Sequence, residues 1–330
     1  MCSALLLTSS AMADQASPGA PIDHGPAHTL DVRNIRPVTV VGVVPGPDMW
    51  RVRKGEHVLW VLGTLDELPE KMQWRAREVR QVIAQAGEVL DVPRVRIHAS
   101  IGYFDRLALN PEGRTLRDVV PPQDYEKWLT LKAAYMGDDE AVEEHRPIYA
   151  AIQLYLTALK RAALSSDMIE PVIDDLLKQR GLTLTPVIYR EDAARSGDPI
   201  GDTRVMPMME LACFEATMQH LEGDLGLMQR RAEAWSSGDL EDLSKLPMSD
   251  QLDKCRDTLL ASGASFNPDI AYIHTRLRDT WLSAARHAIA STSVSFAMLP
   301  MADLFGPDNY LDKLRAEGYR VDRPDSLAGN

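Results

Sequence analysis

Two aspartates are the residues of this sequence whose types and positions best suit a catalytic or ligand-binding role. Asp66 lies three residues after Gly63, at the end of one apolar run, and Asp303 follows another apolar run that ends at Leu299. In sheets covered by helices, ligands bind in the crevice beyond the carboxyl ends of the strands. Two carboxylates in one such crevice would hold a hard divalent cation or carry out acid-base chemistry. The alternative, which the spacing alone favours, is that each aspartate caps a helix or stabilises a turn.

The common catalytic motifs are absent from the sequence. It contains no GxSxG, HExxH, GxxxxGK[ST] or GxGxxG pattern and no cluster of histidine and cysteine. The eight histidines are scattered along the chain, and isolated histidines are more typical of structural or surface positions than of metal ligands. Any chemistry predicted from the sequence therefore depends on carboxylates, and no cofactor is predicted apart from a candidate divalent cation.

The composition is that of a globular protein with an acidic surface. Of the 330 residues, 45% are hydrophobic and 25% are charged, and 48 acidic against 36 basic residues give a net charge of −12. Because the positive charges form no stripe, nucleic acid and anionic membranes are unfavourable partners. No apolar run after the N-terminus is long enough to span a bilayer as a helix. For an exported protein, the expected partner would then be an unknown ligand or protein of the cell envelope.

The N-terminal region predicts export. Residues 1–13 contain an apolar stretch that ends in Ala11-Met12-Ala13, a small-x-small pattern typical of signal-peptide cleavage. No Lys or Arg precedes Arg33, so we read residues 1–13 as a truncated signal peptide whose true start lies upstream. The other interpretation is a frayed apolar N-terminus of a cytosolic protein. Residues 14–37 contain recurrent prolines without apolar periodicity and are expected to form a disordered tether. A periplasmic or secreted location follows.

The cysteines then predict one disulfide. Removal of residues 1–13 takes away Cys2 and leaves Cys213 and Cys255. These two should pair in an oxidising compartment. Neither belongs to a CxxC motif, so the sequence supports neither a zinc ribbon nor a thioredoxin-type redox site.

The apolar periodicity predicts strands near both ends of the chain and helices between them. We therefore expect one α/β domain over residues 38–330, with a mixed central sheet built from N- and C-terminal segments around a large helical middle. Helices are predicted around 79–86, 125–135, 148–159, 168–177, 211–235, 252–259, 270–288 and 309–317, and strands at 49–52, 57–62, 95–101, 182–189, 293–299 and 319–321. Residues 211–235 read as one long helix whose apolar stripe packs inside the domain, and a loop is expected to carry Asp303 and Gly306.

Two segments resemble the signatures of a known family. Residues 59–69, LWVLGTLDELP, resemble the opening signature of the TraB/GumN family, in which a strand leads into Gly-Thr-x-His. Residues 296–321 resemble its second signature, Gly-x-x-His-Leu-x-Gly. Residues 115–122 and the Arg146-Pro147 helix start are also family-like, so the resemblance spans about residues 47–323 and is closest to the GumN branch.

The resemblance implies a fold and a site. The fold would be similar to that of the erythromycin-esterase and ChaN-like proteins, with two Gly-x-x-His motifs meeting at one pocket, and some relatives are metal-dependent proteases. Carried over residue by residue, Gly63 matches the first glycine and Gly306 the closing glycine of the second motif. Asp66 replaces the first histidine, Pro300 the second glycine, and Asp303 the second histidine.

Two further family positions have partial matches. The family's Arg-Asn pair is matched by Arg278-Asp279, with Arg276 as the alternative arginine. The acid expected after residues 89–90 is either Asp91 or missing.

These matches set the functional expectation. Because imidazole favours transition metals and carboxylates favour harder cations, replacement of both histidines changes what the site can hold. We expect an exported protein with a degenerate family site in a binding or accessory role, linked to exopolysaccharide production. The alternative is a metal-dependent hydrolase or peptidase that uses Asp66 and Asp303 together with Arg278, and whether the chain is an enzyme stays open.

Overall fold

The computed structural model describes residues 46–98, 108–165, 168–192, 207–223, 225–247, 255, 272–305 and 309–324. The predicted signal peptide at 1–13 and the tether at 14–37 lie outside these residues.

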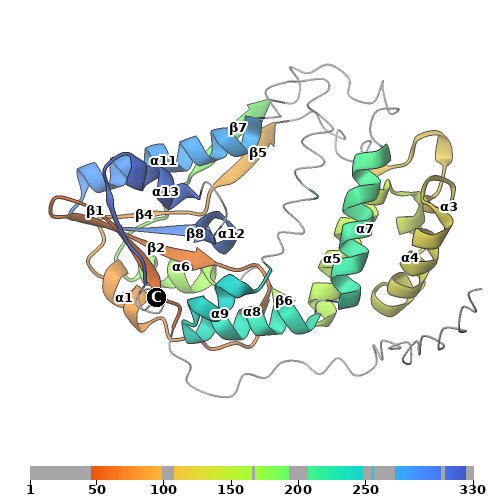
Figure 1. The fold of residues 1–330 in the computed structure, drawn as a ribbon, viewed down its shortest axis with the longest axis horizontal. Helices are drawn as coiled ribbons and strands as arrows, with labels where there is room; N and C mark the ends of the chain where they lie inside the picture. Colours follow the sequence, from red (N-terminus) through yellow and green to blue (C-terminus); the bar gives the residue numbers. More distant parts are fainter. Residues whose placement is uncertain are drawn as a thin grey trace, which may run out of the picture.

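A five-stranded mixed sheet is built from both ends of the described chain, as the sequence predicts (Figure 1). Its order is β4-β8-β2-β1-β9, in which β4, β8 and β2 are parallel and β1 is antiparallel to both β2 and β9. The strands span Met49–Lys54 for β1, His57–Thr64 for β2, Glu88–Leu90 for β4, Val294–Pro300 for β8 and Arg320–Asp322 for β9. Two small sheets pair β3 (Leu68–Pro69) with β6 (Leu164–Ser165) and β5 (Arg94–His98) with β7 (Ile188–Asp192).

The β1–β2 hairpin forms where the sequence predicts it. Its two-residue turn lies between the paired residues Lys54 and His57, and Gly55 in this turn has φ +61°, a conformation that favours glycine. On β2, Leu59 and Val61 are fully buried while Trp60 between them is only half-buried. The alternation assigns the two faces of the hairpin to different surroundings.

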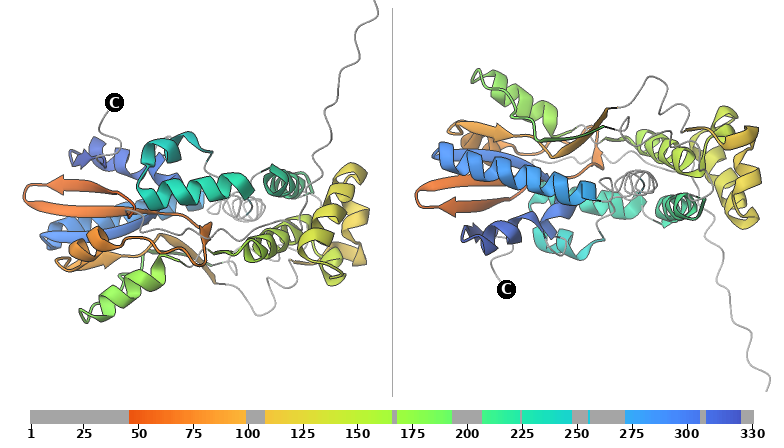
Figure 2. Two further views of the ribbon diagram at one scale, coloured as in Figure 1. Left: turned by 90° about the horizontal axis from the view of Figure 1, so that it is seen from below. Right: turned by 90° about the horizontal axis from the view of Figure 1, so that it is seen from above.

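Helices cover the two faces of the sheet unequally. The face that carries Leu59 lies under α11 (Ile273–Ser291), α12 (Met301–Phe305) and α13 (Tyr310–Ala316), and the ring of Phe305 packs edge-on against Trp50 of β1. The opposite face is covered by α1 (Arg77–Ile83), against which α6 (Glu170–Lys178) packs (Figure 2).

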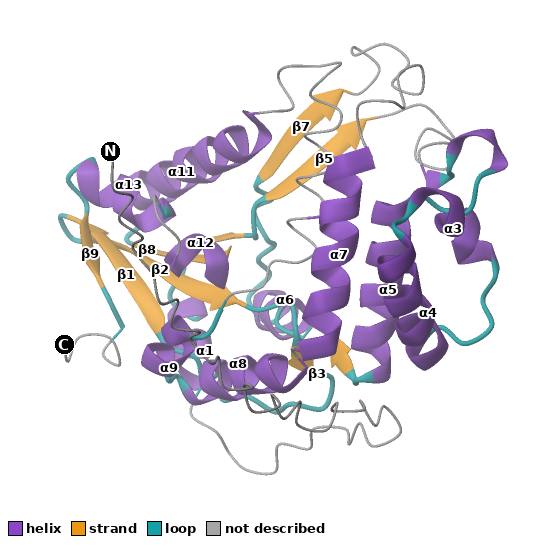
Figure 3. Ribbon diagram, turned by 45° about the vertical axis from the view of Figure 1, so that its right-hand side comes forward, coloured by secondary structure: helices purple, strands orange, loops and turns teal. Residues whose placement is uncertain are grey.

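The described residues bury two hydrophobic cores. The first lies around the sheet, and the second lies among α3 (Leu116–Val119), α4 (Pro122–Tyr135), α5 (Pro147–Arg161) and α7 (Pro207–Gly223). Figure 3 shows this helical group beside the sheet, with α8 (Leu225–Ser237) and α9 (Leu240–Lys245) below. Two 3₁₀ turns, Pro111–Gly113 and Ala141–Glu144, complete the described helices.

The prediction of one long helix over 211–235 is wrong. The segment forms two helices, α7 and α8, whose axes run in different directions (Figure 1). Gly223 and Gly226 flank the change of direction, and glycine weakens a helix because it has the most conformational freedom to lose. The apolar stripe packs inside the protein as expected, but Phe214 and Met228 belong to the second core whereas Trp235 belongs to the first.

Two other predictions need correction, and a third is confirmed over the part that the structure describes. The strand predicted at 182–189 begins only at Ile188, because Pro186 lacks the N–H that a ladder requires. The strand predicted at 95–101 is confirmed over residues 95–98, which belong to β5, and residues 99–101 lie outside the described part. Asp303 lies on α12 rather than in a loop, because the chain turns directly from Pro300 into a helix. Gly306 and most of the helix predicted at 252–259 lie outside the described residues.

Cys213 and Cys255 form the disulfide that the sequence predicts. Their Cα atoms are 5.2 Å apart, within the range of a native disulfide, and both side chains are buried. The crosslink joins α7 to a residue 42 positions later in the chain. It therefore anchors that later residue to the second hydrophobic core.

Reduction should destabilise the protein. Chain-entropy estimates give up to about 4 kcal/mol for a closed loop of this size, and measured effects are usually smaller. We expect the melting temperature to fall by several degrees when dithiothreitol is added, and Cys213→Ser should produce the same fall without the reductant. Titration of two free thiols in the native, unreduced protein would contradict the crosslink.

Candidate functional site

The two aspartates singled out by the sequence follow neighbouring strands. Strands β2 and β8 run parallel, with Thr64 opposite Pro300 at their carboxyl ends, and the Thr64 hydroxyl donates a hydrogen bond to the Leu299 carbonyl at 3.3 Å. Asp66 follows β2 in an exposed bend, and Asp303 is half-buried on α12 directly after β8. The chain thus leaves the same edge of the sheet at both motifs, which is the edge where ligands bind in such folds. A pocket shared by the two carboxyl groups stays a prediction.

Gly63 lets the second motif pack onto the first. A Cβ at this buried position would lie 2.7 Å from the Met301 sulfur and 3.0 Å from Leu304 Cδ1, both on α12. The Gly63 carbonyl also accepts a hydrogen bond of 2.8 Å from the indole N–H of Trp235 on α8. Glycine therefore leaves room for Met301 and Leu304, and a larger residue would make these two side chains shift, because the helix that carries Asp303 lies directly against the strand that precedes Asp66.

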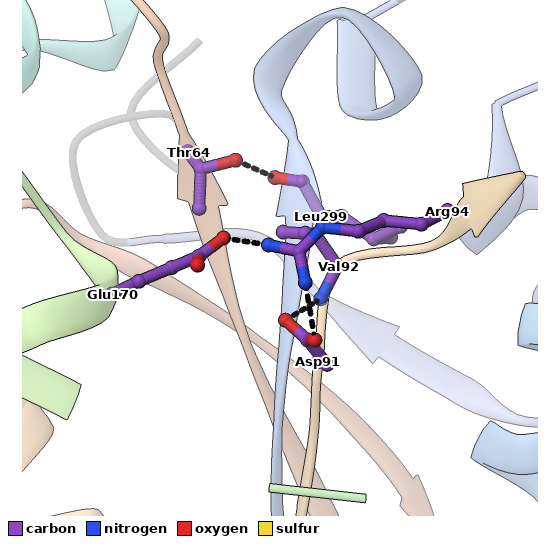
Figure 4. A network of polar contacts seen from close by, with 6 residues as sticks. All are labelled: Thr64, Asp91, Val92, Arg94, Glu170 and Leu299. Carbon is purple, nitrogen blue, oxygen red and sulfur yellow. Dashed lines mark hydrogen bonds and ion pairs between the residues drawn. The ribbon is translucent and has the colours of Figure 1, made fainter. Parts of the chain in front are cut away.

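A third aspartate occupies the corresponding place after β4. Asp91 is buried, and its carboxylate accepts hydrogen bonds from the Val92 N–H at 2.8 Å and from Arg94 Nη1 at 2.6 Å (Figure 4). Arg94 also pairs with Glu170 at the start of α6. Burial raises the pKa of Asp91, although the charge of Arg94 opposes this. Three adjacent parallel strands thus each lead into an aspartate, of which Asp91 is neutralised by an arginine.

The residue that sequence reasoning missed is Glu67. It directly follows Asp66 but is buried, and its carboxylate accepts a hydrogen bond of 2.5 Å from Arg231 Nη2 and another from the Tyr155 hydroxyl. His220 Nε2 lies 3.5 Å from the same carboxylate. Arg231, Tyr155 and His220 come from α8, α5 and α7, so four segments meet at one carboxylate. We call these four residues the Glu67 cluster.

The electrostatics of the Glu67 cluster favour an ionised carboxylate. Burial raises the pKa of Glu67, but the hydrogen bond from His220, the charge of Arg231 and the hydrogen bond from Tyr155 together lower it below its usual value. Burial and the neighbouring carboxylate raise the pKa of Tyr155, which therefore stays protonated and donates. Arg231 is fixed further by a 2.8 Å hydrogen bond from Nη1 to the Pro247 carbonyl. The cluster is suited to positioning Asp66 rather than to exchanging protons.

The remaining candidate residues are less constrained. Arg278 is half-buried on α11, and its predicted action together with the two aspartates stays a prediction. Arg276 and Asp279 line an open groove along α11. This groove also includes Glu88, the first residue of β4, so it adjoins the opposite end of that strand from Asp91. Among the described residues, no group of three or more His, Cys, Asp or Glu side chains is arranged to hold a metal ion.

Comparison with known proteins gives one match. The model of the TraB/PrgY/gumN family matches residues 48–323. No curated protein and no solved structure matches the chain.

Breaking the Glu67 cluster should destabilise the fold. Removal of one partner from a buried ion pair leaves the other charge without compensation, which typically costs about 3–5 kcal/mol. We therefore expect Glu67→Gln to lower the free energy of unfolding by an amount of this order in urea titrations. Glu70→Gln, the same change at an exposed position nearby, is the control and should have little effect. Equal stabilities of the two variants would contradict a structural role for Glu67.

The destabilisation caused by Glu67→Gln should depend on pH. Because the folded-state pKa of Glu67 is lowered, its carboxylate stabilises the fold above the unfolded-state pKa, and this contribution is lost as the pH falls through the folded-state value. The stability difference between the wild type and Glu67→Gln should therefore shrink as the pH falls from 7 toward 3. Urea unfolding of both proteins across this range measures it, and a constant difference would contradict the lowered pKa.

Proposed function

Because the chain belongs to the TraB/PrgY/gumN family over residues 48–323, we propose that it is an exported envelope protein whose family site now serves binding or an accessory role. The observation that carries this proposal is the pair of aspartates. Asp66 and Asp303 stand at the strand-end positions where the resemblance places the two signature histidines. Without imidazole at either position, the site is poorly suited to the transition metals that drive hydrolysis.

The surroundings of the strand ends support a binding site. Asp91 is held by Arg94 and Glu67 by Arg231, so two of the acids near this edge are neutralised and fixed by arginine. Asp66 is exposed beside the rigid Glu67 cluster. A water-accessible carboxylate on a segment held by buried charge pairs suits recognition of a polar ligand, because its oxygens accept hydrogen bonds and its backbone is already positioned.

Export is supported by independent features. The disulfide between Cys213 and Cys255 is of a kind that persists in oxidising compartments, and residues 1–13 have the pattern of a signal peptide. No helix in the described part of the chain is long and apolar enough to cross a membrane. We place the mature protein in the periplasm or outside the cell, with residues 38–330 as one domain. The link to exopolysaccharide production rests on the resemblance to the GumN branch.

The test separates binding from catalysis. The full chain is purified from the exported fraction, and native mass spectrometry records any co-purified ligand for the wild type, Asp66→Asn and Asp303→Asn. The control is Asp138→Asn, a change in the exposed bend that follows α4. We expect a bound mass in the wild type and the control and its loss in both site variants, with no casein hydrolysis in Mg²⁺, Ca²⁺, Mn²⁺ or Zn²⁺.

The alternative function has its own signature in the same experiment. If the chain is a metal-dependent hydrolase or peptidase that uses Asp66, Asp303 and Arg278, one of these ions should raise the melting temperature and support casein cleavage. Asp66→Asn should then abolish both effects while Asp138→Asn keeps them. That result would overturn the proposed binding role.

A further inference from the structure

A positively charged patch lies on the sheet face opposite α11. Arg51 and Arg53 of β1 pair in register with Trp60 and Val58 of β2, and Arg53 also pairs with Arg320 of β9. Directly opposite residues of antiparallel strands share a face, so these side chains stand together on three neighbouring strands, which Figure 3 shows side by side. We call this surface the Arg51–Trp60 face.

The face has a surplus of positive charge. Asp322 is the carboxylate that pairs with both Arg53 and Arg320. Arg51 stands opposite Asp322 in the register of β1 and β9, but no ion pair joins Arg51 to a carboxylate among the described residues. The guanidinium carbon of Arg51 lies 5.5 Å from the centre of the Trp60 ring. In a chain of net charge −12, such a local excess of arginine favours an anion.

A hollow adjoins the tryptophan. It has a volume of about 440 Å³ and lies between the sheet and α1, with Trp60, Val58 and Val294 on the sheet side. Glu78 and Gln81 of α1 and Gln85, in the turn that follows this helix, line the other side, and all three are exposed. The hollow thus combines a flat aromatic surface, carboxamide groups that both donate and accept hydrogen bonds, and a neighbouring guanidinium.

We infer that the Arg51–Trp60 face binds an acidic saccharide, a chain of pyranose rings that carry carboxylates. The apolar face of one ring would pack against the part of the Trp60 indole that lines the hollow, beside the guanidinium of Arg51, and its carboxylate would pair with that guanidinium. The ring hydroxyls would exchange hydrogen bonds with Gln81 and Gln85, and Glu78 would accept from a hydroxyl. The proposal does not rest on the strand-end site, because Val58 lies at the start of β2 whereas Asp66 follows its end.

The experiment is calorimetric titration of the full chain with tetragalacturonate at low ionic strength. Maltotetraose, which has four pyranose rings and no carboxylate, is the neutral control ligand. We expect binding of tetragalacturonate that weakens as salt is added, and no detectable binding of maltotetraose. Absence of tetragalacturonate binding, or equal binding of maltotetraose, would overturn the proposal.

The variants test which groups are responsible. Arg51→Gln should weaken binding about five-fold or more, because a charge-assisted contact is lost, whereas the same change at the exposed Arg117 of α3 should leave the affinity unchanged. Trp60→Phe keeps an aromatic side chain at this half-buried position but offers less area for stacking, so it should also weaken the binding of tetragalacturonate. Equal losses in Arg51→Gln and Arg117→Gln, or binding of tetraglutamate as tight as that of tetragalacturonate, would show general anion attraction and overturn the assignment to a saccharide.

Discussion

The buried ion pair between Glu67 and Arg231 constrains the rest of this structure. Glu67 comes from the segment that leaves β2, and Arg231 lies on α8 between Met228 of the second core and Trp235 of the first. Because an isolated buried charge is strongly unfavourable, the folded protein is stable only when these two segments lie together. The pair therefore couples the arrangement of the two cores to the position of the exposed Asp66.

Four carboxylates near one edge of the sheet have different properties because their neighbours differ. Burial raises the pKa of Asp91 despite Arg94, whereas three donors lower the pKa of Glu67. Asp66 is exposed, and Asp303 is half-buried on α12. Residue type alone would have assigned all four the same chemistry. The geometry instead divides them into two buried acids that pair with arginines and two acids that are at least partly exposed to solvent.

Local sequence patterns predicted those parts of the fold whose signal is local. The β1–β2 hairpin, α11 and β8 were predicted correctly because alternation, helical spacing and turn residues lie within single segments. The break between α7 and α8 was missed, because helical spacing continues across both and does not reveal which core each half enters.

The residues of the candidate site could likewise be predicted only where the signal lies within one segment of the sequence. Asp66 and Asp303 could be singled out because each follows an apolar run and stands at a family position. The Glu67 cluster could not, because the partners of Glu67 lie 88 positions away at Tyr155 and 164 positions away at Arg231. Nothing in the local sequence distinguishes the buried Glu67 from the exposed Asp66 beside it. An arginine within an amphipathic helix normally faces water, so the burial of Arg231 could not be predicted either.

The position of β8 in the sheet determines when the protein can fold. This strand lies between β4 and β2, yet its residues 294–300 are synthesised more than 200 residues after those of β4 (294 − 90 = 204). The hairpin and α1 can form early, but the parallel pairs of the sheet must wait until nearly the whole chain has left the ribosome, and such long-range pairing is slow. A chain that delays its own central sheet in this way remains unfolded for longer during synthesis, and an unfolded chain is the form that a narrow translocation channel can accept.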